Sequence, residues 1–131
     1  MKKILLVTGL VLSFFTLPSF AGHWQFATSG YIPRGAWSPG YESDGAPLYL
    51  CRARYAGSVT PGKIRRGFRG CHISYAGREI SRSRYRVFVN RGRKARGHWV
   101  RRHQGRVPAR AWRVGRDSNG APLCLFRVRI G

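Results

Sequence analysis

The scarcity of carboxylate side chains limits the chemistry that this chain can perform. Only four acidic residues occur among 131, namely Glu42, Asp44, Glu79 and Asp117. They leave little material for catalysis by a carboxylate pair, and they almost exclude a calcium site built from several carboxylates. The sequence has no Gly-x-Ser-x-Gly motif and no phosphate-binding glycine loop followed by Lys and Ser or Thr. It therefore predicts a binding protein rather than an enzyme.

Histidine and cysteine do not form a metal-binding pattern. Neither Cys71-His72 nor the pair His98 and His103 has the spacing that a tetrahedral zinc site requires. We therefore expect no metal and no other cofactor.

Positive charge dominates the composition. Lys and Arg total 25 against four acidic residues, the formal net charge is +21, and only four of the 25 are Lys. Such a charge attracts polyanions, and the guanidinium group suits bidentate pairing with phosphate or sulfate. The hydrophobic content of 43% and the aromatic content of 13% nevertheless indicate a folded domain rather than a disordered basic tail.

The N-terminus has the pattern of a secretory signal peptide over residues 1–21. Lys2 and Lys3 precede an apolar run from Ile4 to Pro18, and small residues lead up to Ala21. A transmembrane anchor is the alternative interpretation, but the run is short for a span. The mature chain is therefore expected to be secreted or periplasmic, where disulfides can form. Three cysteines allow at most one internal disulfide, and three small buried thiols are an equally good interpretation. They are Cys51, Cys71 and Cys124.

The chain repeats itself at an offset of 75 residues. Aligned without a gap, residues 23–56 and 98–131 share 15 identities over 34 positions, among them Trp24 with Trp99 and Trp37 with Trp112. A fixed period of this length indicates two copies of one supersecondary unit. We expect one β domain over 22–131, with a full first repeat at 22–89, a basic linker at 90–97 and a partial second repeat at 98–131.

Apolar residues alternate with polar ones in several segments, which predicts half-buried strands. Residues 48–55, 84–89 and 123–130 show this pattern, and shorter strands are expected at 24–26 and 99–100. Ser43-Asp44-Gly45 and Ser118-Asn119-Gly120 have the composition of hairpin turns. The predicted fold class is all-β, with antiparallel sheets from two pseudo-equivalent tandem repeats, the second of which is truncated.

The order of these motifs resembles the DM-nine repeat family, whose tandem-repeat members include mannose-binding lectins. The resemblance rests on Gly40-x-Glu42-x-Asp44-Gly45, Leu48-Tyr49-x-Cys51-Arg52-Ala53, Pro61-Gly62-Lys63 and Tyr75-Ala76-Gly77-x-Glu79. It implies an antiparallel β fold and a glycan ligand of the mannose type, which lectins of that family bind. The family tends to have Gly where this chain has Ala76.

The resemblance also implies which residues bind the sugar. The acidic residue of the family's first motif falls on Glu42, its lysine falls on Lys63, and Asp44 is a neighbouring candidate. In the second copy the acidic position falls on Asp117, but no equivalent lysine follows. A carboxylate accepts hydrogen bonds from two vicinal hydroxyls and an ammonium group donates to their oxygens, so the residue types suit a sugar.

Structural interpretations of the same residues remain open. Glu42 could pair with an arginine, Lys63 could be a solvated turn residue, and Asp44 could serve only the turn. Glu79 is expected to neutralise an arginine. The repeated tryptophans are expected to pack in the core rather than stack on sugar rings.

Two functions compete at this stage. The first is an exported, non-enzymatic, mannose-type carbohydrate-binding protein. The second is a cationic protein that binds lipopolysaccharide, acidic glycans, nucleic acid or a membrane surface. A second copy of the chain could also complete the short repeat as a homodimer.

Overall fold

The computed structural model describes residues 22–90, 101 and 106–125. The predicted signal peptide and most of the predicted linker lie outside these residues. The described chain is all-β, as expected, and none of its residues forms a helix that could cross a membrane. The strands are β1 (Gly22–Thr28), β2 (Gly40–Tyr41), β3 (Pro47–Tyr55), β4 (Ser58–Ile64), β5 (Cys71–Tyr75), β6 (Arg78–Arg82), β7 (Arg84–Asn90), β8 (Arg113–Arg116) and β9 (Pro122–Cys124).

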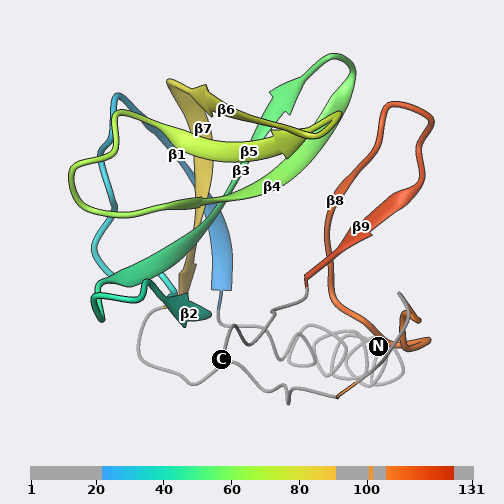
Figure 1. Ribbon diagram of the computed structural model, residues 1–131, viewed down its shortest axis with the longest axis horizontal. Coiled ribbons are helices and arrows are strands. Elements are labelled where there is room, and N and C mark those ends of the chain that lie inside the picture. Colours follow the sequence, from blue (N-terminus) through green and yellow to red (C-terminus); the bar gives the residue numbers. More distant parts are fainter. Residues whose placement is uncertain (1–21, 91–100, 102–105, 126–131) are drawn as a thin grey trace, which may run out of the picture.

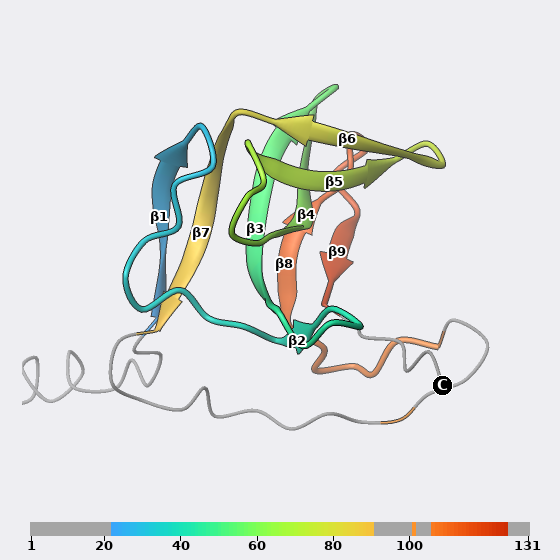
Figure 2. The same cartoon turned by 60° about the vertical axis from the view of Figure 1, so that its left-hand side comes forward.

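The strands form one antiparallel sheet in the order β1-β7-β3-β4-β5-β6. Figure 2 shows the β5–β6 hairpin crossing over the end of the sheet, with β8 and β9 beyond β4. One edge of β4 pairs with β3. The other edge pairs with β5 over one part of its length and with β8 over another. Gly62 and Lys63 pair with β5, and Val59 pairs with Arg116 of β8. β4 is therefore the strand on which the first repeat and the β8–β9 hairpin meet (Figure 1).

Period-two alternation separates the two faces of the sheet. On β3, Cys51 and Ala53 belong to one buried cluster with Ile64, Ile73 and Val87. This cluster is the core of the first repeat, and the alternation predicted for residues 48–55 is confirmed.

A disulfide joins two strands inside this core. Cys51 of β3 and Cys71 of β5 are bonded, and both are fully buried. Cys124 is free and partly buried. The bond links β3 to β5 across β4, so it decides between the two cysteine interpretations that the sequence left open.

The opposite face of the sheet carries an aromatic cluster. Trp24, Trp37 and Trp112 pack around Phe88, with ring centroids 5.3, 6.1 and 4.8 Å from it. Val114 of β8 is fully buried in the same cluster. These three tryptophans are packing residues, as expected, and they attach the second repeat to the first. Trp99 lies outside the described residues.

The backbone of the second repeat reproduces that of the first. Ala36 N donates to Pro33 O at 3.1 Å, and Ala111 N to Pro108 O at 3.0 Å. Leu50 N donates to Trp37 O at 3.1 Å, and its counterpart 75 residues later, Leu125 N, donates to Trp112 O at 3.0 Å. The pseudo-equivalence predicted from sequence is therefore present in the hydrogen bonding over 33–50 and 108–125. The predicted strand at 123–130 begins as β9, which ends at Cys124. Leu125 is described but belongs to no strand, and residues 126–130 lie outside the described chain.

The buried hydroxyl of Tyr85 makes the stability of the first-repeat core depend on pH. Its hydroxyl donates to Tyr31 O at 2.8 Å, and burial raises the pKa of Tyr85 above its ordinary value of 10.0. The neutral phenol therefore stabilises the fold fully below about pH 10, and this contribution is lost as pH rises through the higher pKa of the folded state. We expect Tyr85→Phe to lower the free energy of unfolding by about 1 kcal/mol at pH 7. Above pH 10, the stability of this variant is expected to fall less steeply with pH than that of the unmodified protein.

Urea unfolding at both pH values measures this effect, and Tyr41→Phe is the matched control because Tyr41 is 71% exposed. Parallel losses of stability in Tyr85→Phe and the unmodified protein would contradict the assignment.

Candidate functional site

Lys63 occupies a position that the preceding glycine makes possible. A Cβ added at Gly62 would overlap the backbone carbonyl of His72, so glycine allows β5 to approach β4 closely. Lys63 then pairs directly with His72 in the antiparallel register. The Pro-Gly-Lys motif thus sets the distance between two strands as well as supplying a cation.

Glu79 of β6 contacts both of these residues. Its Oε1 lies 4.0 Å from Lys63 Nζ and 2.9 Å from His72 Nδ1. The Lys63 and Glu79 side chains are 45% and 55% exposed, so the pair is solvated and accessible. Glu79 was expected to neutralise an arginine, and that prediction is wrong. The β5–β6 hairpin brings Glu79 to a lysine and a histidine instead.

An aromatic ring packs beside this cluster. Phe68, in the loop after β4, stacks on His72 with ring centroids 4.0 Å apart and an interplanar angle of 10°. Its backbone N donates to Arg65 O at 3.1 Å, which closes the turn that presents the ring. Sequence analysis missed both Phe68 and His72. The sequence signal for Phe68 was an aromatic residue directly after a glycine. Gly67 has a φ of 95°, which marks a turn at that position.

Asp44 has both of its carboxylate oxygens engaged. Oδ1 accepts from Ala46 N at 2.9 Å, and Oδ2 lies 3.3 Å from Arg65 Nη2. The hydrogen bond from Ala46 and the positive charge of Arg65 hold the pKa of Asp44 below its ordinary value. Asp44 therefore forms the turn, and it also ties that turn to Arg65, which follows the end of β4.

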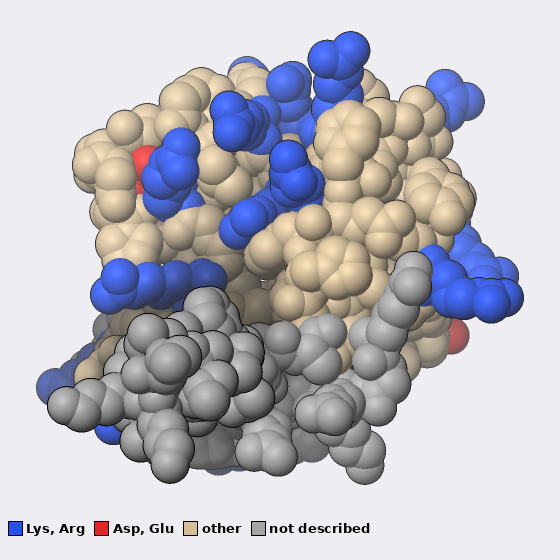
Figure 3. All heavy atoms as spheres, turned by 180° about the vertical axis from the view of Figure 1, so that it is seen from behind, with Lys and Arg blue, Asp and Glu red and all other residues tan. Residues whose placement is uncertain are grey.

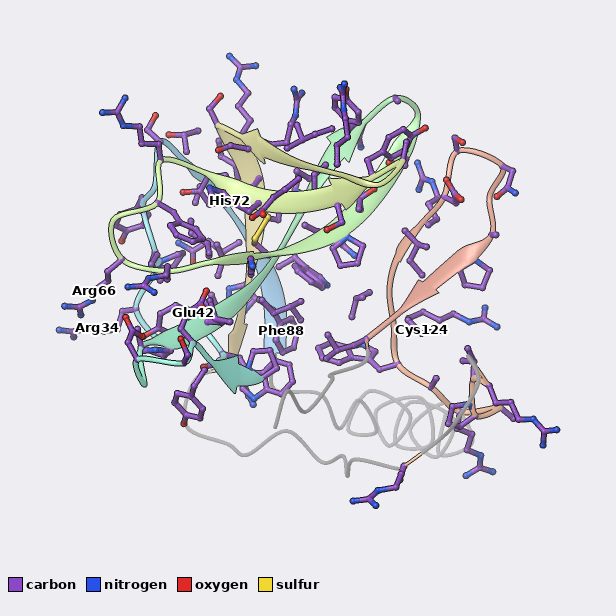
Figure 4. All side chains as sticks on the ribbon, viewed as in Figure 1. Arg34, Glu42, Arg66, His72, Phe88 and Cys124 are labelled. Carbon is purple, nitrogen blue, oxygen red and sulfur yellow. A yellow bond between two sulfur atoms is a disulfide. The ribbon has the colours of Figure 1, made fainter. Side chains whose placement is uncertain are left out.

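Glu42 lies at the start of the same turn, before β3 (Figure 4). Its backbone N donates to Ala46 O at 2.8 Å, and its backbone O accepts from Gly45 N at 2.9 Å. Its carboxylate makes no hydrogen bond or ion pair with the residues that the structure describes, so the alternative pairing with an arginine is not seen there. No ion pair joins Glu42 to Lys63 within that part of the chain either. Their segments are linked by the ion pair of Asp44, two residues after Glu42, with Arg65, two residues after Lys63.

Asp117 occupies the equivalent position in the second repeat. Its backbone N donates to Ala121 O at 2.7 Å, and its backbone O accepts from Gly120 N at 2.9 Å. Its Oδ1 accepts from Ser118 N at 2.7 Å. Lys63 is the one lysine in the described ranges, so no described lysine lies beside Asp117 as a counterpart of Lys63.

Within residues 22–90, 101 and 106–125, no three His, Cys, Asp or Glu side chains gather where they could hold a metal ion. The arrangement offers an exposed ammonium group on β4 and an exposed carboxylate on β6, and such charged groups form strong hydrogen bonds with hydroxyls.

Comparison with known families adds a finding to this geometry. The family model of the DM9 repeat matches residues 10–82 and again residues 65–131. None of the curated proteins matches the chain.

Proposed function

Because the chain belongs to the DM9 repeat family, which is associated with carbohydrate-binding lectins, we propose that it is an exported, non-enzymatic protein that binds a mannose-type sugar. Lys63 donates to ring hydroxyl oxygens, and the Glu42 carboxylate accepts from vicinal hydroxyls. Asp44 positions the turn that carries Glu42. Asp117 contributes at most a weaker second site, because its repeat has no described lysine beside it.

The proposal is supported mainly by the lack of strong partners for the charged groups of Lys63 and Glu42. Lys63 is 45% exposed and is only loosely paired with Glu79, at 4.0 Å. The Glu42 carboxylate has no partner among the described residues. Both groups are therefore available to a ligand, and charged hydrogen-bonding partners give about twice the strength of neutral ones.

Export is supported by the disulfide between Cys51 and Cys71. Stable disulfides occur mainly in secreted and periplasmic proteins, since the cytosol keeps thiols reduced. The signal-like segment over residues 1–21 leads to the same proposal.

Substitution of the two charged residues tests the sugar site. We expect Glu42→Gln and Lys63→Gln each to weaken mannose binding by about tenfold or more, because each removes a charged hydrogen-bonding partner. Asp117→Asn is the matched control and is expected to leave binding within about twofold. Isothermal titration calorimetry with mannose measures all four proteins, and binding to the neutral sugar is expected to change little with salt.

Two results would count against the proposal in different ways. Equal affinity in all four proteins would remove the assigned site. A folded, unmodified protein that binds no sugar on a glycan array would remove the function.

A further inference from the structure

Three arginines, from β3, β7 and β8, gather at the face of the sheet that carries the aromatic cluster. Arg52 of β3 is directly opposite Arg86 of β7 in the strand register. Arg52 Nη1 donates to the carbonyl oxygen of Val114 at 3.2 Å, which brings it to β8 and so towards Arg116. Burial lowers the pKa of Arg52, and the positive charges of Arg86 and Arg116 lower it further. The charges of Arg86 and Arg116 therefore both act on Arg52.

Arg52 is held in place by its surroundings. Its guanidinium carbon lies 4.0 Å from the ring centroid of Trp24, so the side chain is stacked as well as hydrogen-bonded. A guanidinium group has five N–H donors, and one of them is used by Val114. Arg86 and Arg116 are exposed. The cluster thus combines one fixed arginine with two that can adjust to a ligand.

Among the described residues, no Asp or Glu forms an ion pair with these arginines. All four acidic residues of the chain lie in the described residues, and their ion pairs there go to Lys63, Arg65 and His72. Figure 3 shows basic side chains gathered over the middle and upper part of one face, with the visible acidic side chains towards its edges. Like charges held together without a counterion are unfavourable, and a bound anion removes that cost.

We propose that Arg52, Arg86 and Arg116 form a binding site for a tetrahedral oxyanion, namely a phosphate or sulfate ester carried by a glycan. The planar guanidinium fork matches two oxygens of such a group. Arg52 and Arg86 are direct cross-strand neighbours, and Arg52 reaches β8 through Val114, so these cations suit a compact group with several oxygens.

The position of Lys63 favours a glycan as the molecule that carries the phosphate or sulfate ester. This choice of ligand rests on the proposed function. Lys63 lies opposite Leu50 and Arg52 lies opposite Pro61, so alternation places both cations on the same face. They are two residues apart along the strands, which corresponds to about 7 Å. One acidic glycan can therefore reach both sites.

Calorimetric titration with inorganic phosphate and inorganic sulfate tests the anion site by itself. Arg86→Gln and Arg116→Gln are expected to weaken binding of both ions by about tenfold or more. Arg78→Gln, an exposed β6 arginine with the same change of charge, is the control and is expected to stay within about twofold. Equal weakening in all three variants, or no binding by the unmodified protein, would overturn the proposal.

A second arm tests the carrier by comparing mannose, mannose 6-phosphate and vesicles that contain phosphatidic acid. Mannose 6-phosphate is expected to bind more tightly than mannose, and Arg86→Gln is expected to abolish that gain. Vesicle binding that is lost in Arg86→Gln, without any gain for the sugar phosphate, would overturn the assignment to a glycan. Failure of the proposed function is distinguishable, because mannose binding would then be absent while inorganic phosphate still binds.

Discussion

Replacing both Cys51 and Cys71 by alanine is expected to lower the free energy of unfolding by about 3 kcal/mol. The two residues are 20 apart in sequence, and the bond restricts the unfolded chain over that length. Both side chains are fully buried, so the smaller alanine side chains also remove contacts in the first-repeat core. Urea denaturation, followed by tryptophan fluorescence, measures the change.

Cys124→Ala is the matched control for this double variant, because Cys124 is a free cysteine outside the bond. Its stability is expected to lie within about 0.5 kcal/mol of the unmodified protein. Reduction with dithiothreitol should reproduce the loss in the unmodified protein and have no effect on the double variant. A double variant as stable as Cys124→Ala would contradict a disulfide between these residues.

The second large effect is expected at Gly115, where the second repeat touches the first. A Cβ at this position would overlap the carbonyl oxygen of Val59 on β4, whereas a Cβ at the equivalent Gly40 meets nothing within 4 Å. Gly115→Ala is therefore expected to push β8 away from β4 and to cost about 2 kcal/mol. Neither glycine has a positive φ, so backbone strain does not separate the two positions.

Gly40→Ala is the matched control and is expected to change stability by less than about 0.5 kcal/mol. Urea unfolding of both variants gives the comparison, and tryptophan emission reports the packing of Trp112 on Phe88, which are 4.8 Å apart. A Gly115→Ala protein with unchanged stability and unchanged emission would show that β8 does not need this close approach.

Sequence patterns predicted the strands and the repeat well, because both depend on local order. Alternation over residues 48–55 predicted which side chains of β3 face the core, and Cys51 and Ala53 lie there. The turn composition at Asp44-Gly45 recurs at Asn119-Gly120, and the two glycines have φ values of 85° and 86°. These features follow from the preferences of residues close in sequence.

The partners of individual side chains could not be predicted in the same way. Alternation assigns Glu79 to a face but does not say which strand lies beside it. That depends on two pairings: the β5–β6 hairpin aligns Ser74 with Glu79, and the β4–β5 pairing aligns His72 with Lys63. The stacking of Phe68 on His72 likewise needs the loop after β4 to fold back. The disulfide was one of three pairings that three cysteines allow, and only the order of β3, β4 and β5 selects it.

The shared edge of β4 has a consequence for how the chain is assembled. Residues 22–90 contain all six strands of the order β1-β7-β3-β4-β5-β6, so their pairing, including that of β4 with β3 and β5, needs no later residue. The β8–β9 hairpin can dock only after Val59 presents its backbone to Arg116. The first repeat can therefore reach its native strand pairing by itself, and the β8–β9 hairpin then adds to the edge of β4 that remains exposed.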